Sequence, residues 1–530
     1  MKIPYKYAVA LVVAIGLFMA VLDNTVINVA LTAMQQSFNT DINTIQWVIT
    51  AYFLSQAAVI PVAGYFGNRI GIKRLFIIAL AVFTVGSLLC GLAEVLGGTA
   101  SGAGLLVAFR VLQGIGGGML FPLGTAIAFG AFPPAERAAS SAFVAIPVLI
   151  APTLGPTVGG LIVDSALGWP WIFFINIPVG IVAIALVARI LRPDTVEAAG
   201  AGRGAGRAHA PFDYVGLILS MLGVTLVVYA FALVSQTEGG SATAANPRGQ
   251  ILGWDYWLVW TLLGAGLAVL SAFALYELRI ARDPVLDLHL FTSYSFTVTT
   301  VMTWVVRAVV FGSFFLLPLF LQQVRGLSAV TTGLMLIPQG IGAAIGAGSG
   351  SRLYDRIGPR TLVMLGMIAL TISSLLLVGV DTTSGWAFFT PILLLRGLGF
   401  GWSNLPLQTV ALSAITGPAL PKASSLYNAT AQIFSSIGVA VLSTLFIQGT
   451  TDRIADQVSV ARAAGTPPAA DLVQQAGAGA TGSVFLVVTI ATALAALIGF
   501  LLPRQSLKQA EGGHAPGAPS TAPARAIPGD

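Results

Sequence analysis

The strongest constraint on this chain is a series of fourteen apolar runs, separated by more polar segments. An α-helix needs about 20 apolar residues to cross the hydrocarbon core of a bilayer. Because a helix satisfies its own backbone hydrogen bonds in lipid, each run is predicted to be a transmembrane helix. The runs cover residues 8–31, 45–66, 75–95, 103–126, 138–162, 171–191, 213–234, 255–276, 294–320, 328–349, 361–380, 386–412, 423–447 and 483–503.

The composition excludes a soluble protein of this length. Hydrophobic residues make up 56% of the 530 residues and charged residues only 9%, whereas a soluble domain carries about 25% charged residues. The net charge of +6 does not indicate nucleic-acid binding, because the basic residues lie between the apolar runs. Cys90 is the only cysteine, so the chain has neither an intrachain disulfide nor a cysteine cluster that could hold a metal.

The positions of the basic residues predict the orientation in the membrane. Cytoplasmic loops of membrane proteins carry an excess of Lys and Arg. With a cytoplasmic N-terminus and fourteen spans, nineteen of the 26 Lys and Arg residues fall in cytoplasmic segments, four in outside segments and three within spans. Because a wrongly assigned span would scramble this asymmetry, both termini are predicted to be cytoplasmic.

An internal repeat divides the chain. Residues 64–74 (GYFGNRIGIKR) and 351–361 (SRLYDRIGPRT) share Arg-Ile-Gly at an offset of 287, and Arg110 and Arg396 recur in glycine-rich segments at an offset of 286. Related halves with a substrate site between them near the midplane are a transporter architecture. The predicted organisation is a six-helix bundle in 1–192, a linker with two inserted helices in 193–292, a second six-helix bundle in 293–503 and a disordered cytoplasmic tail in 504–530.

The repeated loop resembles the signature loop of the major facilitator superfamily. Its glycines permit a tight turn and close helix approach, and its basic residues can bind helix ends and anionic headgroups. Asn68 replaces the acid of the family pattern, whereas the second copy retains Asp355. The resemblance assigns a conformational role to Gly64, Asn68, Arg69, Gly71, Lys73, Asp355, Arg356 and Gly358.

Three further segments resemble the fourteen-span drug:proton antiporters of that superfamily, which are multidrug exporters. Residues 151–160 (APTLGPTVGG) are similar to the antiporter motif, in which Gly155 and Gly159 form a flat helix face and Pro156 bends the helix. Residues 22–31 (LDNTVINVAL) and 169–181 (WPWIFFINIPVGI) resemble two more family signatures. The resemblance implies an all-α integral membrane protein with the major facilitator fold, that is, two six-helix halves plus two inserted helices.

Asp23 and Arg110 are the predicted proton-coupling residues. An acid inside a span is costly to ionise, so Asp23 is a candidate to take up a proton on one side of the membrane and release it on the other. Arg110 matches a family arginine that is linked to proton transfer, and its movement relative to Asp23 would change which state of the acid is stable. The alternatives are structural: an acid satisfied by Asn24 or Thr25, and an arginine satisfied by backbone carbonyls.

The charge of the transported molecule stays open at this point. The spans contain one deep acid against three arginines, Arg110, Arg307 and Arg396, so an anionic or zwitterionic cargo is an alternative to a lipophilic cation. The resemblance gives no role for Arg307. The predicted substrate-cavity residues are polar or aromatic positions within spans, namely Asn24, Asn28, Trp47, Tyr52, Gln56, Gln113, Trp304, Arg307, Gln339, Asn404, Gln408 and Gln432. Gln46, Asn176 and Asn428 are further polar positions within spans that could line the cavity.

Together these features predict a proton-coupled exporter of small amphipathic molecules that works by alternating access, as a monomer, in the bacterial cytoplasmic (inner) membrane. The expected partners are the substrate and the lipid bilayer, not nucleic acid, and the outside loop 448–482 is a candidate to dock a periplasmic adaptor protein. No enzymatic activity, metal or cofactor besides the coupled proton is expected, because the chain lacks a phosphate-binding G-x-x-x-x-G-K-[ST] loop and clustered histidines. The alternative is a facilitator or importer of a specific metabolite.

Overall fold

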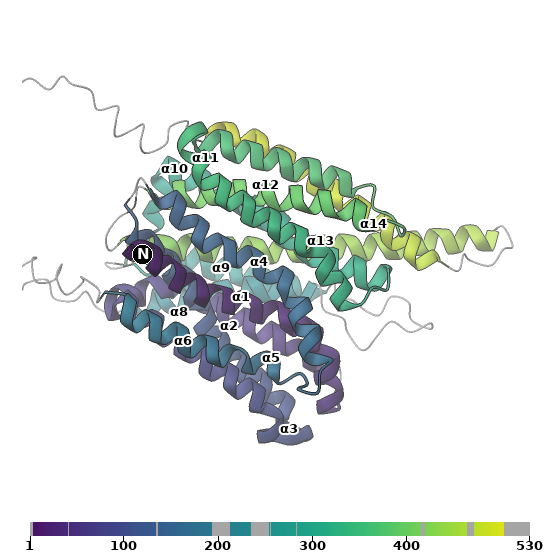
Figure 1. Cartoon of the computed structure of the whole chain (residues 1–530), viewed down its shortest axis with the longest axis horizontal. Coiled ribbons are helices and arrows are strands. Elements are labelled where there is room, and N and C mark those ends of the chain that lie inside the picture. The colour runs from purple at the N-terminus through teal and green to yellow at the C-terminus, as the bar shows by residue number, and fades with distance from the viewer. Residues whose placement is uncertain are drawn as a thin grey trace, which may run out of the picture.

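The structure, a computed structural model, describes residues 4–40, 42–133, 136–192, 213–234, 254, 256–281, 284–413, 415, 419–463 and 471–502. Within these ranges all regular elements are helices (Figure 1). They are α1 (Tyr5–Phe38), α2 (Ile42–Ile70), α3 (Ile72–Ala131), α4 (Arg137–Val163), α5 (Trp171–Phe174), α6 (Asn176–Ile190), α8 (Tyr214–Val234), α9 (Trp257–Arg279), α10 (Tyr294–Leu319), α11 (Ala329–Leu377), α12 (Trp386–Ser413), α13 (Ala419–Ala463) and α14 (Leu472–Ile498), with short 3₁₀ or π turns at Leu288–Thr292, Phe320–Val324 and Gly499–Leu501.

The number of spans agrees with the sequence prediction. By length and apolar composition, eleven of the described segments are candidate membrane spans, with α3 counted as two segments and α11 as one. Gly358, which has non-helical backbone angles, divides α11 into two spans. When α4 and α12, which are 27 and 28 residues long, are also included, the described residues form fourteen spans.

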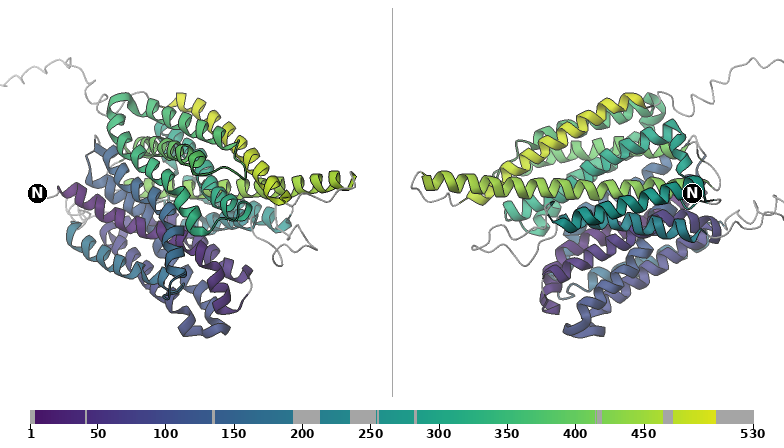
Figure 2. Two further views of the ribbon diagram at one scale, coloured as in Figure 1. Left: turned by 45° about the vertical axis from the view of Figure 1, so that its right-hand side comes forward. Right: turned by 180° about the vertical axis from the view of Figure 1, so that it is seen from behind.

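The spans form two sets of helices with a pair beside them. The first set (α1–α6) and the second set (α10–α14) occupy the lower and upper parts of the bundle in Figure 1. Helices α8 and α9 pack against each other, and α8 also packs against α2 and α13, as the view from behind in Figure 2 shows. We call the end of the bundle that contains Tyr5 and Tyr294 the proximal face, and the end that contains Phe38 and Trp386 the distal face.

Both copies of the repeated loop turn at a glycine with a positive φ. Gly71 has φ 97° and Gly358 has φ 78°. Side chains with a Cβ rarely adopt this left-handed region, so glycine is required where the chain reverses between two spans. The positive φ explains why the glycine of Arg-Ile-Gly recurs at an offset of 287.

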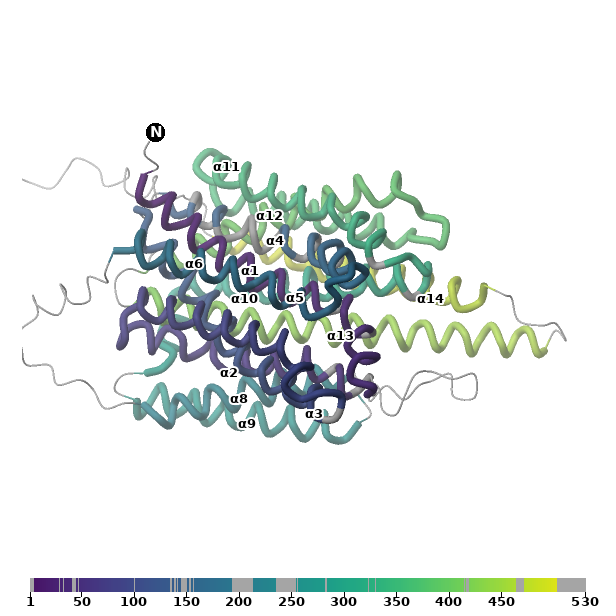
Figure 3. Tube along the Cα trace, turned by 60° about the horizontal axis from the view of Figure 1, so that its bottom comes forward, coloured from purple at the N-terminus to yellow at the C-terminus, as the bar shows by residue number. Residues whose placement is uncertain are grey.

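The region 448–482 differs from its predicted state as an outside loop. Helix α13 continues to Ala463 and α14 begins at Leu472, so most of this region is helical. A helix of 45 residues is about 67 Å long, against a hydrocarbon core of about 30 Å. Hydropathy marks only the part of a helix that is buried in lipid, and residues 448–463 are polar. The resulting extension of α13 projects from the distal face (Figure 3), while the linker 193–211 and the tail 504–530 lie outside the described residues.

The two sets meet closely at the proximal face. The backbone N–H of Gly64 in α2 donates to Ser425 Oγ of α13 at 2.7 Å. One residue earlier, Ser424 Oγ donates to the carbonyl of Pro122 in α3 at 2.9 Å. A side chain at Gly64 would overlap the backbone of Pro421, so glycine is needed for this approach. Two serine hydroxyls of α13 are therefore hydrogen-bonded directly to the backbone of the first set.

Arg137, the first residue of α4, closes the same face at a second point. Its Nη1 donates to the carbonyls of Leu412, Ser413 and Ile415 at 2.8, 2.7 and 3.0 Å. Carbonyls at the end of a helix have no partner within that helix and carry partial negative charge, so a guanidinium stabilises them. In this structure the sets are thus held together at the proximal face by a cation of the first set and the end of α12.

We expect Arg137→Gln to open the proximal face. The variant would be made with Cys90→Ala and with Ala423→Cys as a reporter, because Ala423 is fully buried in α13 where it meets α2. Loss of the charged contacts should raise the rate of labelling by N-ethylmaleimide about tenfold for every 1.4 kcal/mol removed from the closed state. The control compares labelling of the buried Cys90 in the natural chain and in Arg137→Gln alone. This rate should be the same in both proteins. Equal labelling rates at Ala423→Cys with and without Arg137 would contradict the proposed closure.

Candidate functional site

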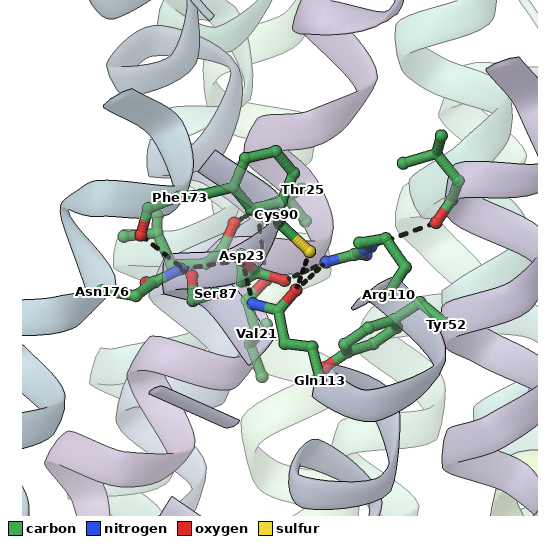
Figure 4. A network of polar contacts seen from close by, with 12 residues as sticks. Val21, Asp23, Thr25, Tyr52, Ser87, Cys90, Arg110, Gln113, Phe173 and Asn176 are labelled. Atoms are coloured by element: carbon green, nitrogen blue, oxygen red, sulfur yellow. Dashed lines mark hydrogen bonds and ion pairs between the residues drawn. The ribbon is translucent and has the colours of Figure 1, made fainter. Parts of the chain in front are cut away.

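Asp23 lies at the centre of a buried polar cluster in the first set (Figure 4). Its side chain is 2% exposed, and its Oδ2 pairs with Arg110 Nη1 at 2.6 Å. Its Oδ1 accepts hydrogen bonds from Gln113 Nε2 at 2.9 Å and from Asn176 Nδ2 at 2.8 Å. One carboxylate of α1 therefore connects to two positions of α3 and to the first residue of α6.

Arg110 has both kinds of partner that the sequence analysis considered, an acid and a backbone carbonyl. Besides the ion pair with Asp23, its Nη1 donates to Gln113 Oε1 at 2.7 Å and its Nε donates to the carbonyl of Val48 in α2 at 3.1 Å. The guanidinium carbon lies 4.0 Å from the centre of the Tyr52 ring, which is a favourable cation–π geometry. The cluster thus also includes α2.

An outer layer of small polar groups holds this cluster in place. Asn176 Nδ2 also contacts Ser87 Oγ at 3.0 Å, and Ser87 Oγ donates to the carbonyl of Phe173 at 2.9 Å. The thiol of Cys90 lies 3.7 Å from Gln113 Oε1. Asn176 was among the polar groups within spans that were expected to line the cavity, and it lies in the 169–181 segment that resembles the antiporters. Ser87 and Cys90 carried no such signal in the sequence.

Side chains from two other helices contact the Asp23 carboxylate. Its three hydrogen-bond donors are side chains of α3 and α6, and its ionic partner Arg110 is itself fully buried. A buried arginine that loses its counter-charge is strongly destabilised, so it must find other partners or move. The Asp23 carboxylate therefore links the positions of α1, α3 and α6.

The glycines of the predicted antiporter motif pack α4 against α1 next to Asp23. A Cβ at Gly155 would overlap the Thr25 side chain, and one at Gly159 would lie 3.0 Å from the carbonyl of Val26. These contacts have the close helix approach that the spacing of the two glycines predicts. The side chains of Pro156 and Asn28, which the sequence analysis also singled out, lie outside the described residues.

The other predicted cavity residues are distributed over both sets. Tyr52 and Gln113 belong to the Asp23 cluster, while Trp47 lies beside Tyr229 of α8, with ring centres 5.8 Å apart. The rest lie within spans of the first and second sets, where Gln56, Gln339, Asn404 and Gln408 are buried and Asn24, Trp304, Arg307 and Gln432 are half-buried.

The residues of the repeated loop lie at the proximal face. Lys73 Nζ donates to the carbonyl of Ala188 at 2.8 Å and to that of Leu191, so a basic residue of the loop does bind a helix end as expected. The guanidinium of Arg69 lies 4.8 Å from the centre of the Tyr65 ring. Asn68 is half-buried, whereas Asp355 and Arg356 are exposed in the second copy.

Arg307 and Arg396, the two arginines deep within spans of the second set, are not ion-paired within the described residues. Arg396 is fully buried, and its Nη1 donates to Ser374 Oγ at 2.8 Å. Arg307 is half-buried, with its guanidinium carbon 5.3 Å from the centre of the Phe311 ring. The described ion pairs of the chain include Asp23 with Arg110 but none with Arg307 or Arg396.

We expect Asp23 and Arg110 to behave as one energetic unit. Asp23→Asn and Arg110→Gln should each lower the free energy of unfolding by about 3–5 kcal/mol, because each leaves a buried partner without compensation. The double variant should lose clearly less than the sum of the two single losses. The measurement is the thermal unfolding midpoint of the purified protein in one detergent.

A matched control combines Asp23→Asn with Arg396→Gln, which removes a buried arginine of the other set. These two effects should add, because distant residues without shared partners behave independently. Additive losses for Asp23 and Arg110 as well would contradict the assignment of the pair as a unit.

Comparisons with known proteins find similar sequences among membrane transporters. The family model described as Major Facilitator Superfamily matches residues 13–439. A multidrug resistance protein B homolog of Mycobacterium tuberculosis is 33% identical over 438 residues, which is 81% of this chain and 74% of the relative. The fatty acid resistance protein FarB of Neisseria gonorrhoeae is 32% identical over 443 residues, which is 83% of this chain and 80% of the relative.

Solved structures share the fold at low sequence identity. The proton:xylose symporter XylE of E. coli, bound to 6-bromo-6-deoxy-D-glucose, superposes with a TM-score of 0.61 and 15% identity over 94% of this chain and 95% of its own. The human organic anion transporter MFSD10 superposes with a TM-score of 0.56 and 13% identity over 92% of this chain and all of its own. At these identities the likeness concerns the fold alone.

Proposed function

Because the chain belongs to the major facilitator superfamily, we propose that it exports small amphipathic molecules in exchange for protons by alternating access. The observation that carries this proposal is the Asp23 carboxylate, which is buried within α1 and bonded to Arg110, Gln113 and Asn176. An ionisable group at this depth is costly and is typically kept for transport of ions or substrates.

In the proposed cycle Asp23 exchanges its proton as the sets change their contact. With Asp23 ionised, Arg110 holds α3 to α1; a proton on Asp23 removes the counter-charge and weakens this connection. Such a difference between two states of one group is what lets a proton shift a conformational equilibrium. The proximal contacts of Arg137 and Gly64 would then break as the opposite face closes.

Export and orientation rest on two further arguments. The excess of basic residues at the proximal face supports its assignment to the cytoplasm, in the inner membrane of a bacterium. The names of relatives, which include multidrug resistance protein B homologs, MdtD and a fatty acid resistance protein, support removal of harmful amphipathic compounds from the cell. A membrane potential of about 100 mV supplies about 2.3 kcal/mol per proton, enough for a roughly fifty-fold gradient of a neutral cargo.

The chain would act as a monomer, since the Asp23 cluster is formed by helices of a single copy. The extension of α13 with the start of α14 would reach into the periplasm, and we propose it as the surface for an adaptor protein.

A facilitator or importer of a metabolite is the competing proposal. Such a transporter would differ from the proposed exporter in the direction of substrate movement, and its transport would not depend on protons.

The test is transport by purified protein in liposomes with a trapped pH-sensitive dye. An imposed pH gradient should move at least one member of a panel of anionic, neutral and cationic amphiphiles against its own gradient. Asp23→Asn should reduce this driven movement to the level of protein-free liposomes, while exchange of labelled substrate without a gradient continues. Asp381→Asn, at an exposed acid of the distal face, is the matched control and should behave like the natural protein. Driven transport that survives in Asp23→Asn would overturn the proposed role of Asp23.

A further inference from the structure

The second set carries positive charge within the membrane and no negative charge to balance it. Its acidic residues are Asp355, Asp381, Asp452, Asp456 and Asp471. Asp355 and Asp381 lie where the chain turns between spans, and the other three lie in the distal extension of α13 or just before α14. Arg307 and Arg396 therefore have no carboxylate at their depth in this set, while the one deep acid of the first set is already paired with Arg110.

Arg307 lies near the middle of the membrane. It is thirteen residues from the start of α10, which corresponds to about 20 Å along the helix axis. Its Nε is buried and has no hydrogen-bond partner within the described part of the chain. An unpaired arginine at this depth is rare and faces either the interior of the bundle or a water-filled opening.

The residues around Arg307 indicate that its side chain faces the interior of the bundle and not the lipid. Among the exposed large apolar side chains of the described structure, α10 contributes only Tyr294 and Phe315, toward its two ends. The central part of α10 is therefore not a lipid-facing surface. Gly438 of α13 lies directly against the backbone of Ala308, so α13 covers α10 next to Arg307. Arg307 is half-buried, so its neighbours do not enclose its side chain completely.

A second unsatisfied donor lies one helical turn from Arg307. Trp304 Nε1 is buried and has no hydrogen-bond partner among the residues that the structure describes, and residues three apart lie on the same face of a helix. The indole ring stacks on Phe434 of α13, with ring centres 4.5 Å apart and planes 3° from parallel. On the other side of Arg307, the ring of Phe311 lies 5.3 Å from the guanidinium carbon.

These groups define the chemistry of what would bind there. Trp N–H and the arginine N–H groups are donors only, so their complement is a group that accepts hydrogen bonds and carries negative charge. A carboxylate or sulfonate meets both requirements, and charge-assisted hydrogen bonds to arginine are stronger than those between neutral groups. The stacked aromatic rings offer an apolar surface for the remainder of the molecule.

We propose that Arg307 and Trp304 form the subsite for the oxyanion head of the cargo, which is an amphipathic acid with an aliphatic or aromatic tail. The proposal rests on the proposed transport function and names its substrate class. It divides the work between the sets, with proton exchange at Asp23 in the first and anion binding at Arg307 in the second.

The experiment compares two probes of opposite charge and equal tail, decanesulfonate and decyltrimethylammonium. Binding to the purified protein in nanodiscs is measured by isothermal titration, with empty nanodiscs subtracted. Decanesulfonate should bind more tightly to the natural protein. Arg307→Gln should weaken its binding at least about tenfold, as expected for lost hydrogen bonds to a charged group, without weakening the binding of decyltrimethylammonium.

Two more variants keep the test decisive if Arg307→Gln does not fold. Trp304→Phe retains an aromatic ring but removes the N–H, and should weaken decanesulfonate selectively. Trp257→Phe, at a tryptophan of α9 that is 67% exposed, is the matched control and should bind both probes like the natural protein. Arg307→Lys should retain part of the affinity, because it keeps the charge but not the planar fork.

The proposal is overturned if decyltrimethylammonium binds as tightly as decanesulfonate, or if Arg307→Gln and Trp304→Phe leave the decanesulfonate affinity unchanged. Since binding is measured without any gradient, these outcomes do not depend on proton coupling. Conversely, proton-driven transport of a cationic amphiphile alone would contradict the substrate class and leave the proposed transport function standing.

Discussion

The ion pair between Asp23 and Arg110 is the interaction on which the site depends. Removing both charges from water costs several kcal/mol per ion, and such a pair is often no more stabilising than well-packed apolar side chains. Stability alone therefore does not account for the presence of this pair, whereas its position among the helices does. Gln113 of α3 and Asn176 of α6 donate to the same carboxylate. Gly155 and Gly159 bring α4 against α1 beside it. Four helices are thus arranged around one ionisable group.

The two sets repeat each other in backbone geometry but differ in chemistry. Gly71 and Gly358 turn the chain in the same way, and Arg110 and Arg396 occupy related positions. Only Arg110 has an acid; Arg396 contacts the hydroxyl of Ser374 instead. This asymmetry is what separates a proton-exchanging set from an anion-binding set in the two proposals. Under these two proposals the proton site and the anion site lie in different sets.

Much of the fold could be predicted from the sequence because bilayer thickness fixes the length of each apolar run. The same rule failed where a helix leaves the membrane, since α13 continues as a polar helix to Ala463 and hydropathy does not report helices in water. The central site residues Asp23, Arg110 and Gln113 could be predicted because ionisable and amide groups within spans are costly and therefore conspicuous.

The rest of the site required the tertiary structure. Ser87 and Cys90 are small groups that are common in spans, so only the packing of α3 against α6 shows that they support Asn176 and Gln113. Arg137 was counted among the basic residues that set the orientation, but nothing in its local sequence indicates that it reaches the end of α12. Trp304 and Arg307 stood out in the sequence. Only the structure shows that Trp304 Nε1 and Arg307 Nε have no acceptor among the described residues and that both side chains share one face of α10.

The central claim, that Asp23 is the group that exchanges the proton, is most directly tested by infrared difference spectroscopy of the protein in lipid. Spectra recorded before and after acidification show which buried carboxylates take up a proton, because the protonated acid has its own C=O stretching band. The account predicts a band in the natural protein that is absent from Asp23→Asn and still present in Asp381→Asn. A band that persists unchanged in Asp23→Asn would contradict the account.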